Sequence, residues 1–357
     1  MEQINVTKTY LPPIEEYTSY LNEIWKRGHL TNNGPLLQEL EEKLRQFLGV
    51  KHILIVNNGT IALQIAIKAL GLTGEIITTP FSYVATTSAV AWENCKPIFA
   101  DIDRKTLCIN PAEIVSKITS ATSAILATHV YGNPCDVEQI QSIASSNNLK
   151  IIYDAAHAFG VRYKESSILN SGDISTLSFH ATKLFHTIEG GAIVTNDDDL
   201  AYKIAYMRNF GHNGPEAFDG VGINGKTSEV NAAMGLCVLP KVPELIQSRK
   251  KLSDLYDTLL AGSELARPVI ASNTAYNYSY YPVLFKSENE LTQKRDQLNL
   301  AAIYPRRYFY PSLNTLNYVG EQDTPISEET AKKVLCLPLY HSLTEDNIRR
   351  IASIILS

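Results

Sequence analysis

Residues 150–157 read Lys-Ile-Ile-Tyr-Asp-Ala-Ala-His, an apolar run that ends in an acidic residue. Its β-favouring residues predict a buried strand over Lys150–Tyr153, with Asp154 just beyond its end. Similar runs alternate with helical patterns, which predicts an α/β fold with a mostly parallel central sheet and helices on both faces. The other predicted strands are Ile53–Val56, Glu75–Thr78, Pro97–Ala100, Ala124–Thr128, Ser175–Ser178 and Ala192–Thr195.

Helical patterns flank this alternating region on both sides. Pro12–Arg27 and Leu36–Leu48 predict two helices of an N-terminal arm, and a long helical stretch runs from Ser228 to about Leu260. Beyond that stretch we expect a smaller α+β domain. The predicted division is therefore an arm and large domain over residues 1–240 and a small C-terminal domain over residues 241–357.

Composition limits the classes of partner. A chain of 357 residues with 45% hydrophobic content can bury a large core, and its net charge of -5 supplies no basic field for nucleic acid or an anionic membrane. The five cysteines are scattered and lack metal-ligand spacing, so neither a disulfide framework nor a metal site is expected. The first residues lack a signal-peptide pattern, and no apolar run is long enough to span a bilayer. We expect a cytoplasmic protein whose partners are small molecules.

Asp154 and His157, three residues apart, follow the strand predicted over Lys150–Tyr153. A carboxylate at this point can keep a pyridine nitrogen protonated, which makes the ring an electron sink, and the histidine can hydrogen-bond the phenolic oxygen of such a ring. A helix-capping aspartate with a packed histidine is an equally good interpretation of these residues alone.

Lys183 ends the segment Leu-Ser-Phe-His-Ala-Thr-Lys over residues 177–183, just beyond another predicted strand. A lysine near a strand end can form a Schiff base when burial and neighbouring cations lower its pKa. By itself the segment is also compatible with an ordinary surface lysine, because most lysines are solvated.

Two further segments can contribute to a ligand site. In Val-Asn-Asn-Gly-Thr-Ile-Ala-Leu over residues 56–63, Gly59 and Thr60 lie where a strand turns into a helix, and free N–H groups at a helix start bind anions. In Thr-Pro-Phe-Ser-Tyr-Val-Ala-Thr-Thr over residues 79–87, Tyr83 can offer its ring to a planar cofactor. Both patterns also occur in ordinary turns and cores.

Together these segments resemble the sugar-nucleotide aminotransferases of the DegT/DnrJ/StrS type, which are fold-type I enzymes like aspartate aminotransferase and depend on pyridoxal 5'-phosphate (PLP). The resemblance covers nearly the whole chain, and the motifs occur in the family's order. It implies that Lys183 carries PLP as a Schiff base and shuttles protons, and that Asp154 faces the pyridine nitrogen. His157 stands where many members carry Gln. The other implied cofactor contacts come from Gly59, Thr60, Tyr83, His157 and Ser178.

The segment Gly-Ile-Asn-Gly-Lys-Thr-Ser-Glu over residues 222–229 resembles the family loop that reaches into the neighbouring subunit's site. The resemblance implies that Asn224 contacts the PLP phosphate there and that the protein is a homodimer with shared active sites. Lys226 replaces the arginine that is common in this loop, and we expect it to contact substrate.

The same region also fits the phosphate-loop pattern G-x-x-x-x-G-K-T over Gly220–Thr227. That pattern needs a buried strand immediately before it. Residues 213–219 contain Pro215 and little apolar content, so they cannot form a central strand. We therefore reject a phosphate-loop NTPase.

The segment Tyr-Pro-Arg-Arg-Tyr-Phe-Tyr-Pro over residues 304–311 places Arg306 and Arg307 beside Tyr308. Guanidinium groups among aromatic rings suit phosphate and ring contacts, although a solvated loop with packed tyrosines has the same sequence character. With residues 180–191, this segment resembles the branch of the family that acts on dTDP-linked 6-deoxy keto sugars for surface polysaccharides such as the O-antigen of lipopolysaccharide.

The resemblance implies that L-glutamate converts PLP to pyridoxamine 5'-phosphate, which then aminates the nucleotide-linked keto sugar. We expect amination at C4 of dTDP-4-keto-6-deoxy-D-glucose, giving dTDP-4-amino-4,6-dideoxy-D-glucose, with the 3-keto isomer as the alternative. A sugar dehydratase on this scaffold has His in place of the lysine. A noncatalytic sugar-nucleotide-binding regulator needs neither Lys183 nor Asp154, and the chain has both.

Overall fold

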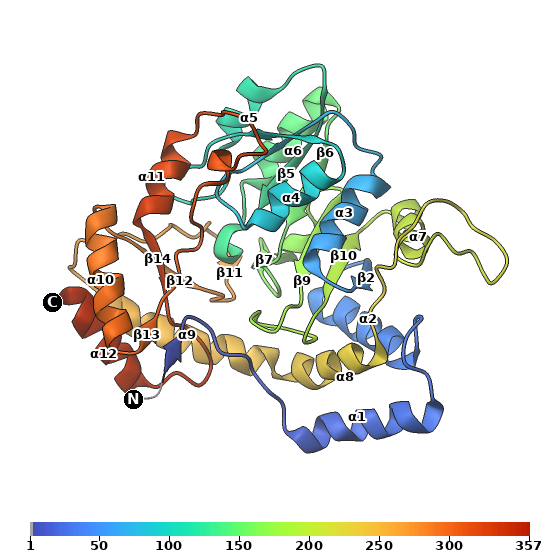
Figure 1. Ribbon diagram of the computed structural model, residues 1–357, viewed down its shortest axis with the longest axis horizontal. Helices are drawn as coiled ribbons and strands as arrows, with labels where there is room; N and C mark the ends of the chain where they lie inside the picture. The colour runs from blue at the N-terminus through green and yellow to red at the C-terminus, as the bar shows by residue number, and fades with distance from the viewer. Residues whose placement is uncertain (1–2) are drawn as a thin grey trace.

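The computed structural model describes residues 3–357, and a seven-stranded sheet forms its centre (Figure 1). All of the predicted strands lie in this sheet. Only β10 runs antiparallel to its neighbours, which confirms the mostly parallel sheet. In sheet order the strands are β2 (His52–Val56), β10 (Gly191–Thr195), β9 (Ile174–Ser178), β6 (Lys150–Asp154), β5 (Thr122–Thr128), β3 (Glu75–Thr78) and β4 (Lys96–Phe99).

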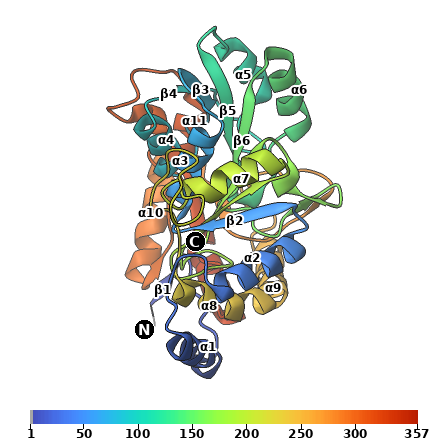
Figure 2. The ribbon, with the colours of Figure 1, turned by 90° about the vertical axis from the view of Figure 1, so that its right-hand side faces the viewer.

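Helices cover both faces of the sheet, as the alternating sequence predicted. Successive strand residues point to opposite faces, so Ile53 and Ile55 join one core cluster while Leu54 and Val56 join the other. Figure 2 shows β2 between α7 and α2. The first face carries α2 (Pro35–Leu48), α5 (Pro111–Lys117), α6 (Val137–Asn147) and α8 (Glu229–Val238). The second carries α3 (Gly59–Ala69), α4 (Val84–Trp92) and α7 (Asp198–Met207).

The N-terminal arm begins with α1 (Ile14–Arg27), which packs on α8 through a hydrogen bond from the Tyr17 hydroxyl to the Val230 carbonyl, 3.2 Å long. Both predicted arm helices, α1 and α2, are present. Gly28 and Gly49 end them in left-handed conformations, which glycine adopts without strain.

The C-terminal region has a core cluster of its own that also includes Ile4. Residues at the start of the chain reach this region, because β1 (Ile4–Asn5) pairs in parallel with β13 (Ile303–Tyr304). The domain boundary at residue 240 stays a prediction. The remaining elements are α9 (Val242–Leu259), β12 (Tyr281–Leu284), α10 (Glu288–Leu300), α11 (Pro325–Lys333), β14 (Val334–Leu337), α12 (Glu345–Leu356) and a small sheet of β7 (Arg162–Tyr163), β8 (Ser166–Ser167) and β11 (Thr274–Ala275).

The long helical stretch predicted from Ser228 to about Leu260 is two helices rather than one. A 3-10 turn over Leu239–Lys241 separates α8 from α9. Pro240 and Pro243 lie at this junction, where a missing backbone N–H interrupts the helical hydrogen bonds. Across residues 3–357, no helix is both long and apolar enough to cross a membrane.

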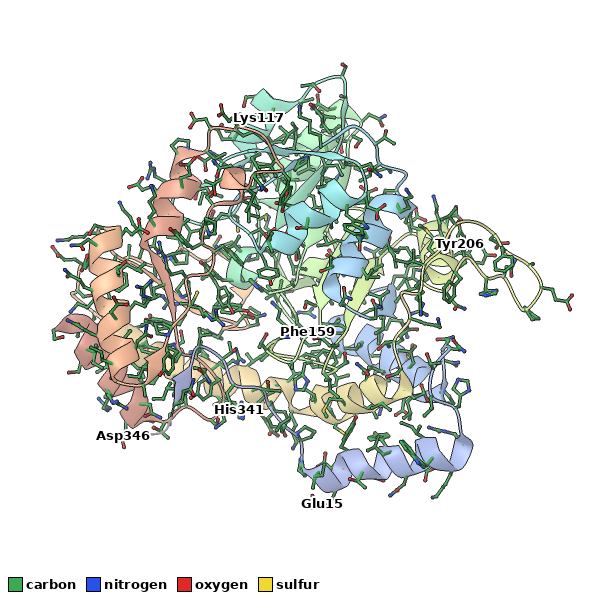
Figure 3. All side chains as sticks on the ribbon, in the orientation of Figure 1. Glu15, Lys117, Phe159, Tyr206, His341 and Asp346 are labelled. Atoms are coloured by element: carbon green, nitrogen blue, oxygen red, sulfur yellow. The ribbon has the colours of Figure 1, made fainter. Side chains whose placement is uncertain are left out.

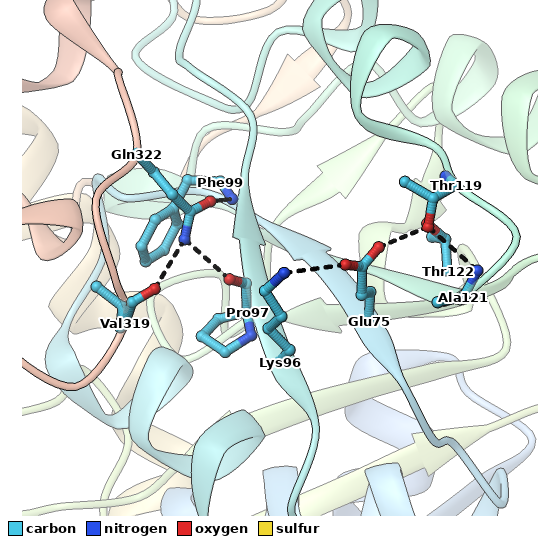
Figure 4. Close-up of polar contacts among 9 residues, drawn as sticks. All are labelled: Glu75, Lys96, Pro97, Phe99, Thr119, Ala121, Thr122, Val319 and Gln322. Atoms are coloured by element: carbon cyan, nitrogen blue, oxygen red, sulfur yellow. Dashed lines mark hydrogen bonds and ion pairs between the residues drawn. The ribbon is translucent and has the colours of Figure 1, made fainter.

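The edge strand β4 is covered by a segment from the C-terminal region. The Gln322 side-chain oxygen accepts the Phe99 N–H at 2.7 Å, and its amide nitrogen donates to the Pro97 carbonyl at 3.0 Å (Figure 4). These bonds occupy backbone groups that an edge strand otherwise leaves free. They also tie the chain that follows residues 306–309 to the large domain.

Candidate active site

A cavity of about 400 Å³ opens at the carboxyl ends of the parallel strands, where open α/β sheets bind ligands. Large-domain residues and residues from the C-terminal region both line it. The structure therefore brings together side chains that are far apart in the sequence. The predicted site residues that line it are Gly59, Thr60, Tyr83, Asp154, His157, Ser178, Lys183, Arg306 and Tyr308.

Lys183 lies in a turn after β9, held by a hydrogen bond from its N–H to the His180 carbonyl, 2.8 Å long. Phe179 and Phe185 on either side of it are buried and pack around Phe159, which Figure 3 labels near the centre of the molecule. Burial lowers the pKa of Lys183 to about 8, although the negative charge of Asp154 opposes the effect. About a tenth of the amine is therefore neutral and nucleophilic at pH 7, far more than for a lysine with the ordinary pKa.

Asp154 is the last residue of β6 and is buried. Its carboxylate accepts the Thr86 hydroxyl at 2.7 Å and the Ala156 N–H at 3.1 Å. Burial raises the pKa of Asp154, while these two hydrogen bonds and the charge of Lys183 oppose the increase. The site thus holds a fixed carboxylate opposite a lysine.

His157 lines the same cavity and is buried. The backbone N–H of Tyr131 donates to its Nδ1 at 3.3 Å, so the neutral ring carries its proton on Nε2. Burial holds the pKa of His157 well below its usual range. Phe309 stacks on the imidazole with ring centroids 5.7 Å apart. His157 is therefore an oriented, uncharged N–H donor, which is the function that a glutamine amide also provides.

The start of α3 forms the predicted anion-binding turn. Asn58 caps the helix by accepting the Ile61 N–H at 2.9 Å, which leaves the amides of Gly59 and Thr60 at the cavity. Ser178 from β9 lies against this turn, because a Cβ on Gly59 would be 3.0 Å from the Ser178 Cβ. The amides at the start of α3 and the hydroxyls of Thr60 and Ser178 can hold a phosphate.

Tyr83 immediately precedes α4 and lines the cavity with 59% of its surface exposed. Large aromatic residues are usually more buried than this, so its ring is available to stack on a bound planar group.

The loop residues Asn224 and Lys226 do not line the cavity of their own chain. The Asn224 side chain accepts a hydrogen bond from Lys226 at 2.6 Å, and Lys226 lies over the Phe210 ring, 4.3 Å from its centroid. The residues before Gly220 form turns and isolated bridges. The premise of the rejection, that no strand immediately precedes this motif, is therefore confirmed.

The structure separates the two adjacent arginines. Arg306 lines the cavity, whereas Arg307 forms an ion pair with Glu288 at 2.7 Å and lies over the Tyr310 ring, 3.5 Å from its centroid. The expected substrate contact of Arg307 is not supported by this geometry, because its guanidinium is occupied by other residues of the chain. In an extended segment successive side chains point to opposite sides, so two adjacent arginines face different surroundings.

Several residues of the cavity were not predicted from the sequence. Tyr280, Ser82 and Thr128 line it, and Thr86 lies behind it in contact with Asp154. A spacing of three residues from Tyr83 to Thr86 was visible in the sequence, but its meaning depends on the turn between them. No sequence signal distinguishes Tyr280 from its neighbouring tyrosines.

The fold and this constellation define an aminotransferase of the DegT/DnrJ/EryC1/StrS family, to which the chain belongs, since the family model matches residues 13–356. Among curated relatives, a dTDP-4-amino-4,6-dideoxy-D-glucose transaminase of Shigella dysenteriae is 46% identical, covering 99% of this chain and 98% of the relative. A protein of the same name from Escherichia coli is 43% identical with the same coverage. The solved structure of DesI in the presence of its TDP-sugar product has a TM-score of 0.94 and 32% identity, covering 99% of this chain and 92% of that chain.

The cofactor of this enzyme is PLP, and the cavity fits it at three points. The amides and hydroxyls near Gly59 suit the phosphate, the buried carboxylate of Asp154 suits the pyridine nitrogen, and Lys183 supplies the amine. His157 adds a neutral donor for the phenolic oxygen. The individual contacts of these residues with PLP stay predictions.

Proposed function

We propose that the protein transfers the amino group of L-glutamate to dTDP-4-keto-6-deoxy-D-glucose, giving dTDP-4-amino-4,6-dideoxy-D-glucose. The observation that carries the transamination is the partly buried Lys183 amine, whose pKa burial lowers to about 8, in one cavity with Asp154. The choice of sugar is supported by the printed names of two relatives that are 46% and 43% identical. We also propose that the enzyme serves the synthesis of surface polysaccharides such as the O-antigen, which is the role that the family resemblance implies.

When bound, PLP supplies a carbonyl that captures amines and a protonated ring that accepts electrons. Asp154 keeps that ring nitrogen protonated, because a buried carboxylate stabilises a neighbouring positive charge. Lys183, once its amine is free, moves the proton between the Cα of the amino donor and C4′ of the cofactor. His157 orients the ring by its uncharged N–H.

Arg306 is the best candidate for anchoring the anionic part of each substrate. No carboxylate within residues 3–357 forms an ion pair with its guanidinium, although it lines the cavity. Glutamate carries carboxylates and the sugar nucleotide carries a diphosphate, and a guanidinium binds both groups by paired hydrogen bonds. Tyr308 lies beside it at the same wall.

We propose a homodimer in which residues 222–227 of one subunit complete the site of the other. Asn224 and Lys226 are close to Asn57 at the start of α3 but do not line their own cavity. The preceding loop exposes apolar side chains, with Phe218 64% and Val221 77% exposed, which is unusual for an isolated surface. We propose a cytoplasmic location because all five cysteines are free and buried, which suits a reducing compartment.

Mixing two inactive variants tests the shared site. Lys183→Ala and Asn224→Ala subunits, refolded together, should form hybrids in which one of the two sites carries no substitution. Random pairing predicts recovery of roughly a quarter of the unmodified activity. Recovery no greater than the sum of the separate variants would show that each subunit uses its own loop.

The first experiment on function is a visible absorption spectrum of the purified protein with PLP. A band that depends on Lys183 and is bleached by L-glutamate establishes the first half-reaction. The dTDP-linked 4-keto and 3-keto sugars are then supplied separately, and the amino-sugar product is identified by mass spectrometry and NMR. Amination of the 3-keto sugar alone would show that the 3-keto isomer, and not the 4-keto sugar, is the substrate. Sugar-nucleotide binding without any band would favour the noncatalytic regulator.

A further inference from the structure

We infer that Thr86, Ser82 and Thr128 form a directed chain of hydroxyl groups that keeps the Asp154 carboxylate ionised and correctly oriented for the cofactor ring. The inference rests on the proposed function. It assigns these three residues a positioning role, because Thr86 acts on the site through Asp154.

The chain consists of three short contacts. Thr86 Oγ1 is 2.7 Å from Asp154 Oδ2, Ser82 Oγ is 2.7 Å from Thr86 Oγ1, and Thr128 Oγ1 is 3.0 Å from Ser82 Oγ. All three hydroxyl-bearing residues are buried. They come from separate parts of the sheet edge, since Thr128 ends β5 and Thr86 lies in the first turn of α4.

The direction of every hydrogen bond in the chain follows from the one that ends at Asp154. An ionised carboxylate can only accept, so Thr86 donates its single proton to Asp154. Thr86 must then accept from Ser82, and Ser82 must accept from Thr128. All of the protons therefore point towards the carboxylate, and the aligned hydroxyl dipoles favour its negative charge.

This arrangement offsets the effect of burial. Burial raises the pKa of Asp154, and the hydrogen bond from Thr86 opposes the rise. The two histidines nearby in the fold supply little positive charge: burial lowers the pKa of His129 to about 3 and that of His157 well below its usual range. His129 donates only its backbone N–H to the Asp154 carbonyl, at 3.0 Å. The remaining cation is Lys183, whose pKa is lowered by burial to about 8.

Thr86 also links Asp154 to the predicted stacking residue. The Thr86 N–H donates to the Tyr83 carbonyl at 3.1 Å, so one turn of chain positions both side chains. The neighbouring Thr87 provides an internal control, since it is equally buried in α4 but its hydroxyl has no hydrogen-bond partner within the described residues 3–357. A substitution of Thr87 therefore removes a buried threonine hydroxyl from α4 without breaking the chain of hydrogen bonds to Asp154.

The test compares Thr86→Val, Thr86→Ser and Thr87→Val in the full-length protein with PLP. Thr86→Val removes the donor at nearly constant volume, so the pKa of Asp154 should rise and the acidic limb of the kcat profile should move to higher pH. On that limb kcat should fall roughly tenfold or more, because a hydrogen bond to a charged group is lost. PLP should also dissociate more readily. Thr86→Ser should restore both properties, and Thr87→Val should leave the limb in place.

A direct readout uses NMR titration of the ¹³C-labelled Asp154 carboxyl carbon in the PLP-free protein. Its midpoint should move upward in Thr86→Val and, by a smaller amount, in Ser82→Ala, which removes the next link. An unchanged midpoint in Thr86→Val would overturn the inference even if transamination is confirmed. Should Thr86→Val fail to fold, Ser82→Ala and Thr86→Ser decide between the outcomes. If the unmodified protein shows no Lys183-dependent band, the proposed function fails, while the NMR midpoint still tests the hydroxyl chain.

Discussion

The two halves of the cavity are built from different kinds of structure. On the cofactor side, Asp154 ends β6 and Ser178 ends β9, so the sheet itself fixes their positions. On the substrate side, Arg306 and Tyr308 lie outside the helices and strands of the C-terminal region, and an isolated bridge joins Arg306 to Cys336. Chemistry that is common to a family can be placed on rigid strand ends, whereas a segment without regular structure can change to suit a substrate.

The largest effect should come from the cofactor side. Lys183→Ala removes both the amine that captures PLP and the base that moves the proton, so turnover should fall by about 10⁴-fold or more. Steady-state assays with glutamate and keto sugar measure this loss, with Lys105→Ala as a surface-lysine control. Near-normal turnover in Lys183→Ala would remove the basis for assigning this half of the cavity to PLP.

Asp154→Asn should have the next largest effect. The amide is similar in size but uncharged, so it no longer stabilises a protonated ring nitrogen, and kcat should fall by roughly 10²–10³-fold. Binding of PLP should be affected less than kcat, since the phosphate contacts are unchanged. A loss of PLP binding with normal kcat at saturating PLP would instead mean that Asp154 has only a structural role.

The adjacent arginines sharpen the contrast within the substrate side. Arg306→Ala should raise the KM for the sugar nucleotide by about tenfold or more, because a charge-assisted contact is lost. Arg307→Ala should leave that KM nearly unchanged and lower the free energy of unfolding by about 1–3 kcal/mol, because its ion pair with Glu288 is lost. Kinetics and thermal denaturation of both variants measure the difference. A reversal of the two phenotypes would contradict the placement of Arg306 at the cavity.

The smallest effect is a pH dependence of cofactor capture. Burial lowers the pKa of Lys183 to about 8, so its amine gains a proton as pH falls below that value. The rate at which PLP-free protein takes up PLP should therefore rise as pH increases through about 8 and then level off. Stopped-flow absorbance measures the profile. A rise centred near the ordinary lysine value would show that the site does not lower the pKa of this amine before PLP arrives.

Sequence reasoning succeeded where chemistry coincides with regular structure. Asp154 and Lys183 became candidates because each follows an apolar run that indicates a strand, and the resemblance to the family implied their roles; both line one cavity. The order of motifs then gave the family, which the match to residues 13–356 confirms. The single helical stretch predicted after Ser228 was wrong in form, because Pro240 lies in the 3-10 turn that divides it into two helices.

By itself the sequence determined the α/β fold and the candidate residues at the strand ends, because these follow from periodicity and local residue chemistry, and the resemblance of its motifs to the family implied the cofactor class. Only the tertiary structure decided that Arg306 faces the cavity while Arg307 pairs with Glu288. Likewise, only folding brings Thr128, Ser82 and Thr86 together in line with Asp154. Hydrogen bonds act over about 3 Å, and nothing in the linear order of residues encodes such separations between distant parts of the chain.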